Sequence, residues 1–163
     1  MGVDPGLVAT GFAVLEAAPG AVTVLDVGVI STGAAQSLEA RLNAIHRAVL
    51  QIIEAHAPAF LVVEDLYAEY KFPRTAILMG HARGVIYLAA RQLGVAVTAL
   101  APSEVKRAVT GSGAAGKAQV QRSVQTLLGL RELPQPSHVA DALGLAVTGL
   151  ARLTGITPKR AAR

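Results

Sequence analysis

Phe60-Leu61-Val62-Val63-Glu64 carries the strongest structural signal in this sequence. An unbroken apolar row is typical of a strand buried on both faces, because such a strand has no solvent-facing side to alternate with. Strands of this kind occur in sheets that are covered by helices. Glu64 then ends the most apolar strand of the chain, so the same stretch indicates both a fold class and a candidate site.

The segments around this strand alternate between strand and helix patterns. Before it, β-branched residues at 11–15 and 21–30, with a Pro-Gly turn between them, indicate a hairpin, and Val3 indicates a short strand ahead of it. Apolar residues at three- and four-residue spacing predict a helix that starts at Ser37 and ends at Pro58. After it we expect a loop at 67–73, a helix at 75–92 and a strand at 95–98.

The last third of the chain has only helical patterns. Pro102-Ser103 starts one helix, a Gly-rich loop at 111–116 leads to a second over 117–128, and a third runs from Ser137 to about Leu153. The whole order predicts an α/β fold with a mixed five-stranded sheet flanked by helices. We expect one domain over 1–155 and a basic, disordered C-terminal tail over 156–163.

Composition narrows the class of protein. The 163 residues contain no Cys, which excludes disulfides and cysteine-based zinc sites, and no apolar run long enough to span a membrane. The start of the sequence lacks the pattern of a secretory signal, so we expect a cytoplasmic protein with no membrane partner. The excess of 15 Lys+Arg over 11 Asp+Glu suits a polyanionic partner, although a net charge of +4 also serves solubility alone.

Three carboxylates stand where predicted elements end or begin. Asp4 comes directly before a Pro-Gly turn, and Glu64 directly follows the buried strand. Asp141 follows His138 by three residues in the last helix, which puts both side chains on one face near its positive end. We expect these side chains to converge, although each alone also fits a purely structural role as turn residue, strand-end charge or helix cap.

Carboxylates gathered in one place repel each other unless a cation lies among them. Oxygen ligands suit Mg²⁺ or Mn²⁺, and an imidazole such as that of His138 shifts the preference toward Mn²⁺. Two such ions about 3.5–4 Å apart are able to hold a phosphodiester, activate a water and stabilise the leaving oxygen. The carboxylate pattern therefore predicts metal-dependent hydrolysis.

An ordered series of short motifs runs along the chain. They are Gly2-Val3-Asp4-Pro5-Gly6 with Thr10-Gly11, Val62-Val63-Glu64-Asp65, His81-Ala82-Arg83-Gly84, Pro102-Ser103-Glu104-Val105-Lys106, Gly116-Lys117-Ala118-Gln119-Val120 and His138-Val139-Ala140-Asp141-Ala142-Leu143. In this order the series resembles the RuvC family of Holliday junction resolvases, from residue 2 to about 150. The resemblance implies an RNase H-like fold and a homodimeric, metal-dependent endodeoxyribonuclease. Such an enzyme resolves four-way DNA junctions by paired symmetrical nicks in recombination and repair.

The resemblance also implies roles for single residues. Metal ligands, for two ions of Mg²⁺ or Mn²⁺, are implied at Asp4, Glu64, His138 and Asp141, although many members carry Asp at the position of His138. Lys106 and Lys117 match basic positions that contact the DNA backbone near the catalytic centre, and Lys117 counts among the catalytic residues. Tyr67 matches an aromatic that stacks on bases at the opened junction, a role that Tyr70 or Phe72 is able to share. A branch-migration complex of the RuvA and RuvB type is the implied partner.

Other interpretations stay open at this point. An RNase H-like nuclease of the YqgF kind acts on RNA and shares the early Asp and the strand-end Glu, but the segments around Lys106 and Lys117 favour a junction nuclease. A non-catalytic DNA-binding module would use the basic face alone. The apolar residues of the helix at 75–92 lie on more than one side, which fits either packing inside one subunit or contact with a second one.

Overall fold

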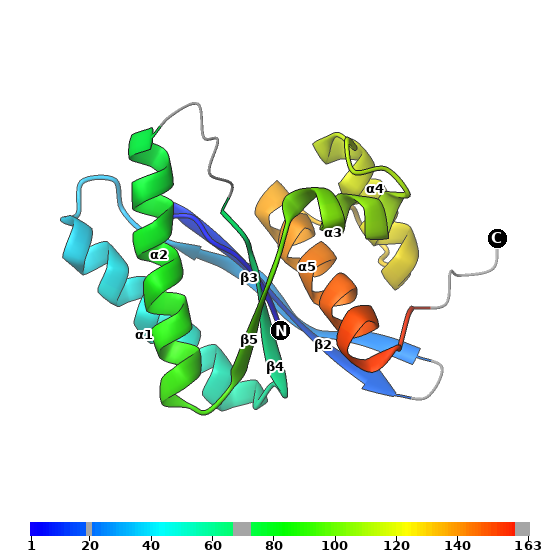
Figure 1. The fold of residues 1–163 in the computed structure, drawn as a ribbon, viewed down its shortest axis with the longest axis horizontal. Coiled ribbons are helices and arrows are strands. Elements are labelled where there is room, and N and C mark those ends of the chain that lie inside the picture. Colours follow the sequence, from blue (N-terminus) through cyan, green and yellow to red (C-terminus); the bar gives the residue numbers. More distant parts are fainter. Residues whose placement is uncertain (19–20, 67–72, 159–163) are drawn as a thin grey trace.

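The structure, a computed structural model, describes residues 1–18, 21–66 and 73–158 and contains one mixed five-stranded sheet (Figure 1). The strands are β1 (Gly2–Asp4), β2 (Ala9–Ala18), β3 (Ala21–Ser31), β4 (Phe60–Glu64) and β5 (Ala96–Leu100), in the order β3-β2-β1-β4-β5. β2 is antiparallel to both of its neighbours, whereas β1, β4 and β5 are parallel. The predicted sheet is confirmed.

Helices cover both faces of this sheet. They are α1 (Leu38–His56), α2 (Pro73–Gln92), α3 (Pro102–Thr110), α4 (Lys117–Leu128) and α5 (Ser137–Thr154). α1 and α2 pack on one face, and α5 packs on the other with α3 and α4 beside it (Figure 1). No helix in the described ranges is long and apolar enough to cross a bilayer.

The predicted boundaries are close to the observed ones, with two notable shifts. α2 begins at Pro73 rather than at Thr75, consistent with the tolerance of a helix's first turn for proline. β2 runs to Ala18, because pairing with β3 extends over the Ala-rich stretch that carries little strand propensity of its own. α5 ends at Thr154, and residues 159–163 lie outside the described residues, so the domain boundary and the disordered tail stay predictions.

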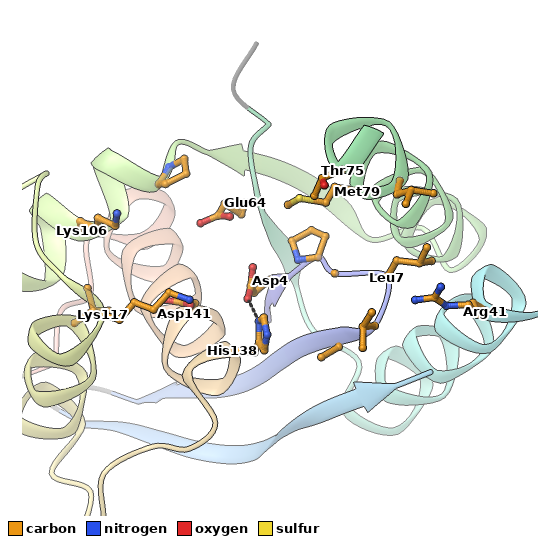
Figure 2. Close-up of a pocket in the computed structure, with 17 residues that line it drawn as sticks. Asp4, Leu7, Arg41, Glu64, Thr75, Met79, Lys106, Lys117, His138 and Asp141 are labelled. Atoms are coloured by element: carbon orange, nitrogen blue, oxygen red, sulfur yellow. Dashed lines mark hydrogen bonds and ion pairs between the residues drawn. The ribbon is translucent and has the colours of Figure 1, made fainter. Parts of the chain in front are cut away.

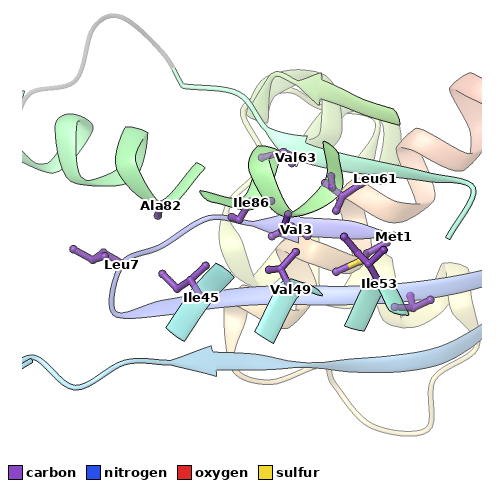
Figure 3. Packing of buried hydrophobic residues seen from close by; sticks show 13 residues of the cluster. Met1, Val3, Leu7, Ile45, Val49, Ile53, Leu61, Val63, Ala82 and Ile86 are labelled. Carbon is purple, nitrogen blue, oxygen red and sulfur yellow. The ribbon is translucent and has the colours of Figure 1, made fainter. Parts of the chain in front are cut away.

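Strand β4 is buried on both faces, as its apolar run predicts. Leu61 and Val63 belong to the main core cluster between the sheet and helices α1 and α2 (Figure 3). Val62 points to the opposite face and packs in a smaller cluster with Leu145 of α5. Glu64 follows these buried residues as the last residue of the strand, at the edge of the hydrophobic core.

Helix α5 lies unusually close to the centre of the sheet. A Cβ atom added to Gly2 of β1 would lie 2.3 Å from the main-chain oxygen of Ala142, and one added to Gly11 of β2 would lie 2.1 Å from that of His138. Both neighbours are backbone atoms of the helix, which cannot move aside as a flexible side chain can. These two glycines therefore set how near α5 comes to the strands.

We expect Gly11→Ala to push the start of α5 away from β2 and to destabilise the protein by about 1–3 kcal/mol, the usual range for overpacking. Urea denaturation followed by circular dichroism measures the effect. Gly84→Ala is the matched control, because an added Cβ in this part of α2 meets nothing within 4 Å. The control should be neutral or stabilising by up to about 1 kcal/mol. Equal stability of Gly11→Ala and the unmodified protein would contradict the close-packing argument.

Candidate active site

The carboxyl ends of β1 and β4 lie side by side, because these strands are parallel neighbours in the sheet. Asp4 is the last residue of β1 and Glu64 is the last residue of β4, so both carboxylates come to the same edge. The first turns of α5 lie against this edge and add His138 and Asp141 (Figure 2). The predicted convergence of distant residues thus rests on strand order and on the packing of α5.

An open cleft of about 640 Å³ is formed at this edge. Every predicted site residue that the structure describes lines it, namely Asp4, Glu64, Lys106, Lys117, His138 and Asp141. The two lysines come from α3 and α4 and face the carboxylates from one end (Figure 2). Tyr67 and Tyr70, predicted to stack on DNA bases, lie outside the described residues, as does Phe72.

Asp4 and His138 form a direct contact across the cleft. Nδ1 of His138 lies 2.7 Å from Oδ2 of Asp4, and this hydrogen bond joins the first strand to the last helix. The carboxylate is buried, whereas the imidazole is 39% exposed and keeps its Nε2 atom free of this contact. A histidine that binds a carboxylate through one ring nitrogen is held in a fixed orientation, so the direction of its other nitrogen is fixed as well.

The environment of Asp4 opposes its ionised form. The pKa of this carboxyl is raised to about 6, chiefly by burial and also by the nearby charge of Asp141, while the hydrogen bond from His138 and the charges of His138 and Lys117 act in the opposite direction. Burial likewise raises the pKa of Asp141, against the lowering effect of Lys117, His138 and Lys106. The carboxylates of the cleft are therefore costly to ionise in the absence of a further cation.

Glu64 has the same character. Burial, followed by the charges of Asp4 and Asp141, raises the pKa of Glu64 to about 7, although Lys106 and Arg83 lower it. Carboxyl groups that are buried and that repel one another are arranged for binding positive charge, since a cation placed among them removes the repulsion. The electrostatics of the cleft thus match the metal site expected from the sequence.

The donor set also fits a hard divalent cation. It consists of three carboxylates and one imidazole, with no thiolate, which suits Mg²⁺ or Mn²⁺. In the described part of the chain, no group of three or more His, Asp or Glu side chains is arranged so that it could hold one ion. Mg²⁺ is commonly held by only one or two carboxylates together with waters and substrate phosphates, so such a cage is not a requirement.

Arg83 of α2 fixes the end of β4, a role that the sequence did not reveal. Its Nη1 atom donates hydrogen bonds to the main-chain oxygen of Glu64 at 2.7 Å and to Oδ1 of Asp65 at 3.0 Å. Its Nη2 atom donates to the hydroxyl of Tyr87 at 3.0 Å, one helical turn further along α2. The guanidinium thus clamps the backbone that carries Glu64. Its place in the His-Ala-Arg-Gly motif was the available signal.

Metal-free protein should lose stability as the pH rises through the pKa of Glu64. The pKa of Glu64 is about 7 in the folded state, against an ordinary value of 4.5. The stabilising contribution of the protonated Glu64 side chain is therefore fully present below pH 4.5 and is lost as the pH rises from 4.5 to about 7. Glu64→Gln removes the loss, so its advantage over the unmodified protein should grow between pH 5 and about 7, by at most about 1.4 kcal/mol per pH unit. Urea denaturation in EDTA measures this, with Glu54→Gln, exposed on α1, as the matched control. A pH-independent difference would disprove the electrostatic account.

Known proteins resemble this chain over most of its length. The family model described as crossover junction endodeoxyribonuclease RuvC matches residues 1–149. The crossover junction endodeoxyribonuclease RuvC of Rhodopirellula baltica is 42% identical, with 91% of this chain and 84% of that protein covered. The protein of the same name from Moorella thermoacetica is 44% identical, with 90% and 87% covered.

A solved structure agrees with the sequence relatives. The structure described as T. thermophilus RuvC in complex with Holliday junction substrate superimposes with a TM-score of 0.86, is 34% identical and covers 97% of each chain. The RNase H-like α/β fold expected from the motif series is confirmed by this likeness. The chain belongs to the RuvC family of crossover junction endodeoxyribonucleases.

Proposed function

We propose that this protein resolves four-way DNA junctions by paired, symmetrical, metal-dependent hydrolysis of phosphodiester bonds during recombination and repair. The observation that carries the proposal is the meeting of Asp4, Glu64, His138 and Asp141 in one cleft, in a chain of the RuvC family. Further support comes from the T. thermophilus relative, whose structure contains a Holliday junction substrate. A cleft of this kind, open to solvent and rimmed by cations, suits a phosphodiester backbone.

Members of the RuvC family are nucleases that need divalent metal ions. In this chain the residues that would hold Mg²⁺ or Mn²⁺, as two ions per site, are Asp4, Glu64, His138 and Asp141. Bound there, the ions supply an activated water and stabilise charge on the phosphate and the leaving oxygen. Two hydrogen bonds hold the strand ends in place before substrate arrives. One joins Asp4 to His138, and the other joins Arg83 to the main-chain oxygen of Glu64.

In this proposal Lys106 and Lys117 bind the DNA substrate. Lys106 lies on α3 and lowers the pKa values of Glu64 and Asp141, and Lys117 opens α4 and lowers those of Asp4 and Asp141, so both ammonium groups act on the carboxylate cluster. An ammonium in this place is able to bind a phosphate oxygen and to offset the charge that develops during hydrolysis. Lys117 therefore takes a catalytic as well as a DNA-binding role in the proposal.

The proposal includes a homodimer, because two-fold symmetry would present two cleavage sites to the two equivalent strands of a junction. Helix α2 exposes Ile77 and Leu88, apolar side chains that suit contact with a second subunit. Tyr67 and Tyr70 are proposed to stack on unpaired bases at the junction centre. A branch-migration complex of the RuvA and RuvB type is the proposed partner, and the cytoplasm is the proposed location.

Asp4→Asn should bind a synthetic four-way junction as well as the unmodified protein while cleaving it at least about 100-fold more slowly, since an amide cannot replace a charged metal ligand. Mobility shift without metal measures binding, and nicking with Mg²⁺ or Mn²⁺ measures cleavage. Asp26→Asn makes the same chemical change on β3, where the carboxylate pairs with His56 outside the cleft, and should cut normally. Cleavage by Asp4→Asn at the normal rate would refute the site assignment.

Junction DNA should be the preferred substrate. We expect paired nicks in a four-way junction, and little cutting of a linear duplex or of structured RNA at the same concentration, because the junction offers a two-fold symmetric enzyme two equivalent strands of like polarity, which a duplex lacks. Cleavage rates on the three nucleic acids, measured side by side, test this. Preference for RNA would favour the alternative RNA nuclease, and tight junction binding without any cleavage would favour a non-catalytic module.

A further inference from the structure

The catalytic cleft extends well beyond its carboxylates. Past Asp4 it continues along the segment that follows β1, with Leu7 and Val8 on one wall and Leu78 and Met79 of α2 among its other lining residues, and it reaches Arg41 of α1 (Figure 2). We call this part the far arm. The lysines lie at the opposite end, so positive charge stands at both ends of the cleft with the carboxylates between them.

Arg41 is tied to the wall of the far arm. Its Nε atom donates a hydrogen bond to the hydroxyl of Thr32 at 3.0 Å, and that buried hydroxyl donates to the main-chain oxygen of Leu7. The amide of Thr32 donates to the main-chain oxygen of Val8 at 3.0 Å, which holds the same wall from a second point. The side chain of Arg41 is therefore anchored near its end rather than free to swing.

The anchor leaves the charge of Arg41 available. The ion pairs among the described residues are His56–Asp26, Arg83–Asp65, His138–Asp4 and Arg152–Glu104, and none of them includes Arg41. Since Nε is taken by Thr32, the two terminal nitrogens supply the remaining donors of the planar guanidinium. Such a fork matches phosphate oxygens better than a single ammonium does. A fixed, unpaired cation at the end of a nuclease cleft is thus suited to an anion of the substrate.

We propose that Arg41 binds a phosphate of the DNA strand that occupies the cleft, at a position away from the phosphate that is cut. The inference rests on the proposed function, because the strand must already lie across the carboxylates for its backbone to reach the far arm. Apolar walls at Leu78 and Met79 suit the sugar and base between the two phosphates, since these groups present little charge. Lys106 and Lys117 on one side and Arg41 on the other then hold the strand on both sides of the cleavage point.

Arg41→Gln and Arg47→Gln form a matched pair for testing this. Both remove one positive charge from α1, but Arg47 is exposed and does not line the cleft. Binding of a fluorescently labelled four-way junction is measured by anisotropy without metal, from low to moderate salt. Arg41→Gln should weaken binding about 3- to 10-fold and reduce the slope of log K against log salt by about 0.9 for each phosphate that the variant no longer neutralises. Arg47→Gln should leave both the affinity and the slope nearly unchanged.

Two further measurements separate binding from a purely structural role. Arg41→Lys keeps the charge without the bond from Nε, so its salt slope should stay near that of the unmodified protein. A lowered melting temperature of Arg41→Gln with an unchanged salt slope would show that Arg41 only supports the Thr32 contact, which overturns the inference. Unchanged affinity and slope in Arg41→Gln would overturn it as well.

Behaviour of the unmodified protein distinguishes this failure from failure of the proposed function. If the unmodified protein neither binds nor cuts the junction, the proposed function fails and the role of Arg41 fails with it. If the unmodified protein binds and cuts, and Arg41→Gln binds equally well with the same salt dependence, then only the role of Arg41 is refuted.

Discussion

The close packing of helix α5 on the central strands determines how the cleft is assembled. At Gly2 and Gly11 the backbone of the helix occupies the space that any side chain would need. Because α5 comes this near, His138 reaches the carboxylate of Asp4 although 134 residues separate them along the chain. A helix held further away by larger side chains would leave the carboxylates of β1 and β4 without their third partner, Asp141.

The two faces of the sheet carry different tasks. The face under α1 and α2 holds the larger core cluster, which stabilises the strands through apolar burial (Figure 3). The opposite face, under α5, brings the polar residues of the cleft together at the ends of the same strands (Figure 2). The helices of the first face nevertheless contribute to the cleft. Arg83 extends from α2 to the backbone of Glu64, and Arg41 extends from α1 to the far arm.

The charged cleft works against the stability of the metal-free fold. Burial raises the pKa values of Asp4, Glu64 and Asp141, and repulsion by neighbouring carboxylates adds to the increase for Asp4 and Glu64. Ionised carboxylates in this cleft are therefore less well solvated than they would be in water. The lysines and Arg83 offset only part of this effect. Sites arranged for chemistry are often destabilising in this way, and here the same repulsion favours the binding of a divalent cation.

Sequence patterns predict the fold class, the approximate extent of each element and the set of acidic candidates, because apolar periodicity and strand-end carboxylates are local properties of the chain. The ordered motifs of the sequence also indicate the family. The packing of the elements was needed to show that β1 and β4 are neighbours, that His138 contacts Asp4, and that Arg41 and Arg83 differ from other helix-surface arginines. The aromatic pair Tyr67 and Tyr70 stays a prediction, since it lies outside the described residues. The contacts of His138, Arg41 and Arg83 could not be predicted because periodicity reports which side of an element is buried, whereas the partner of a polar side chain depends on how distant elements pack.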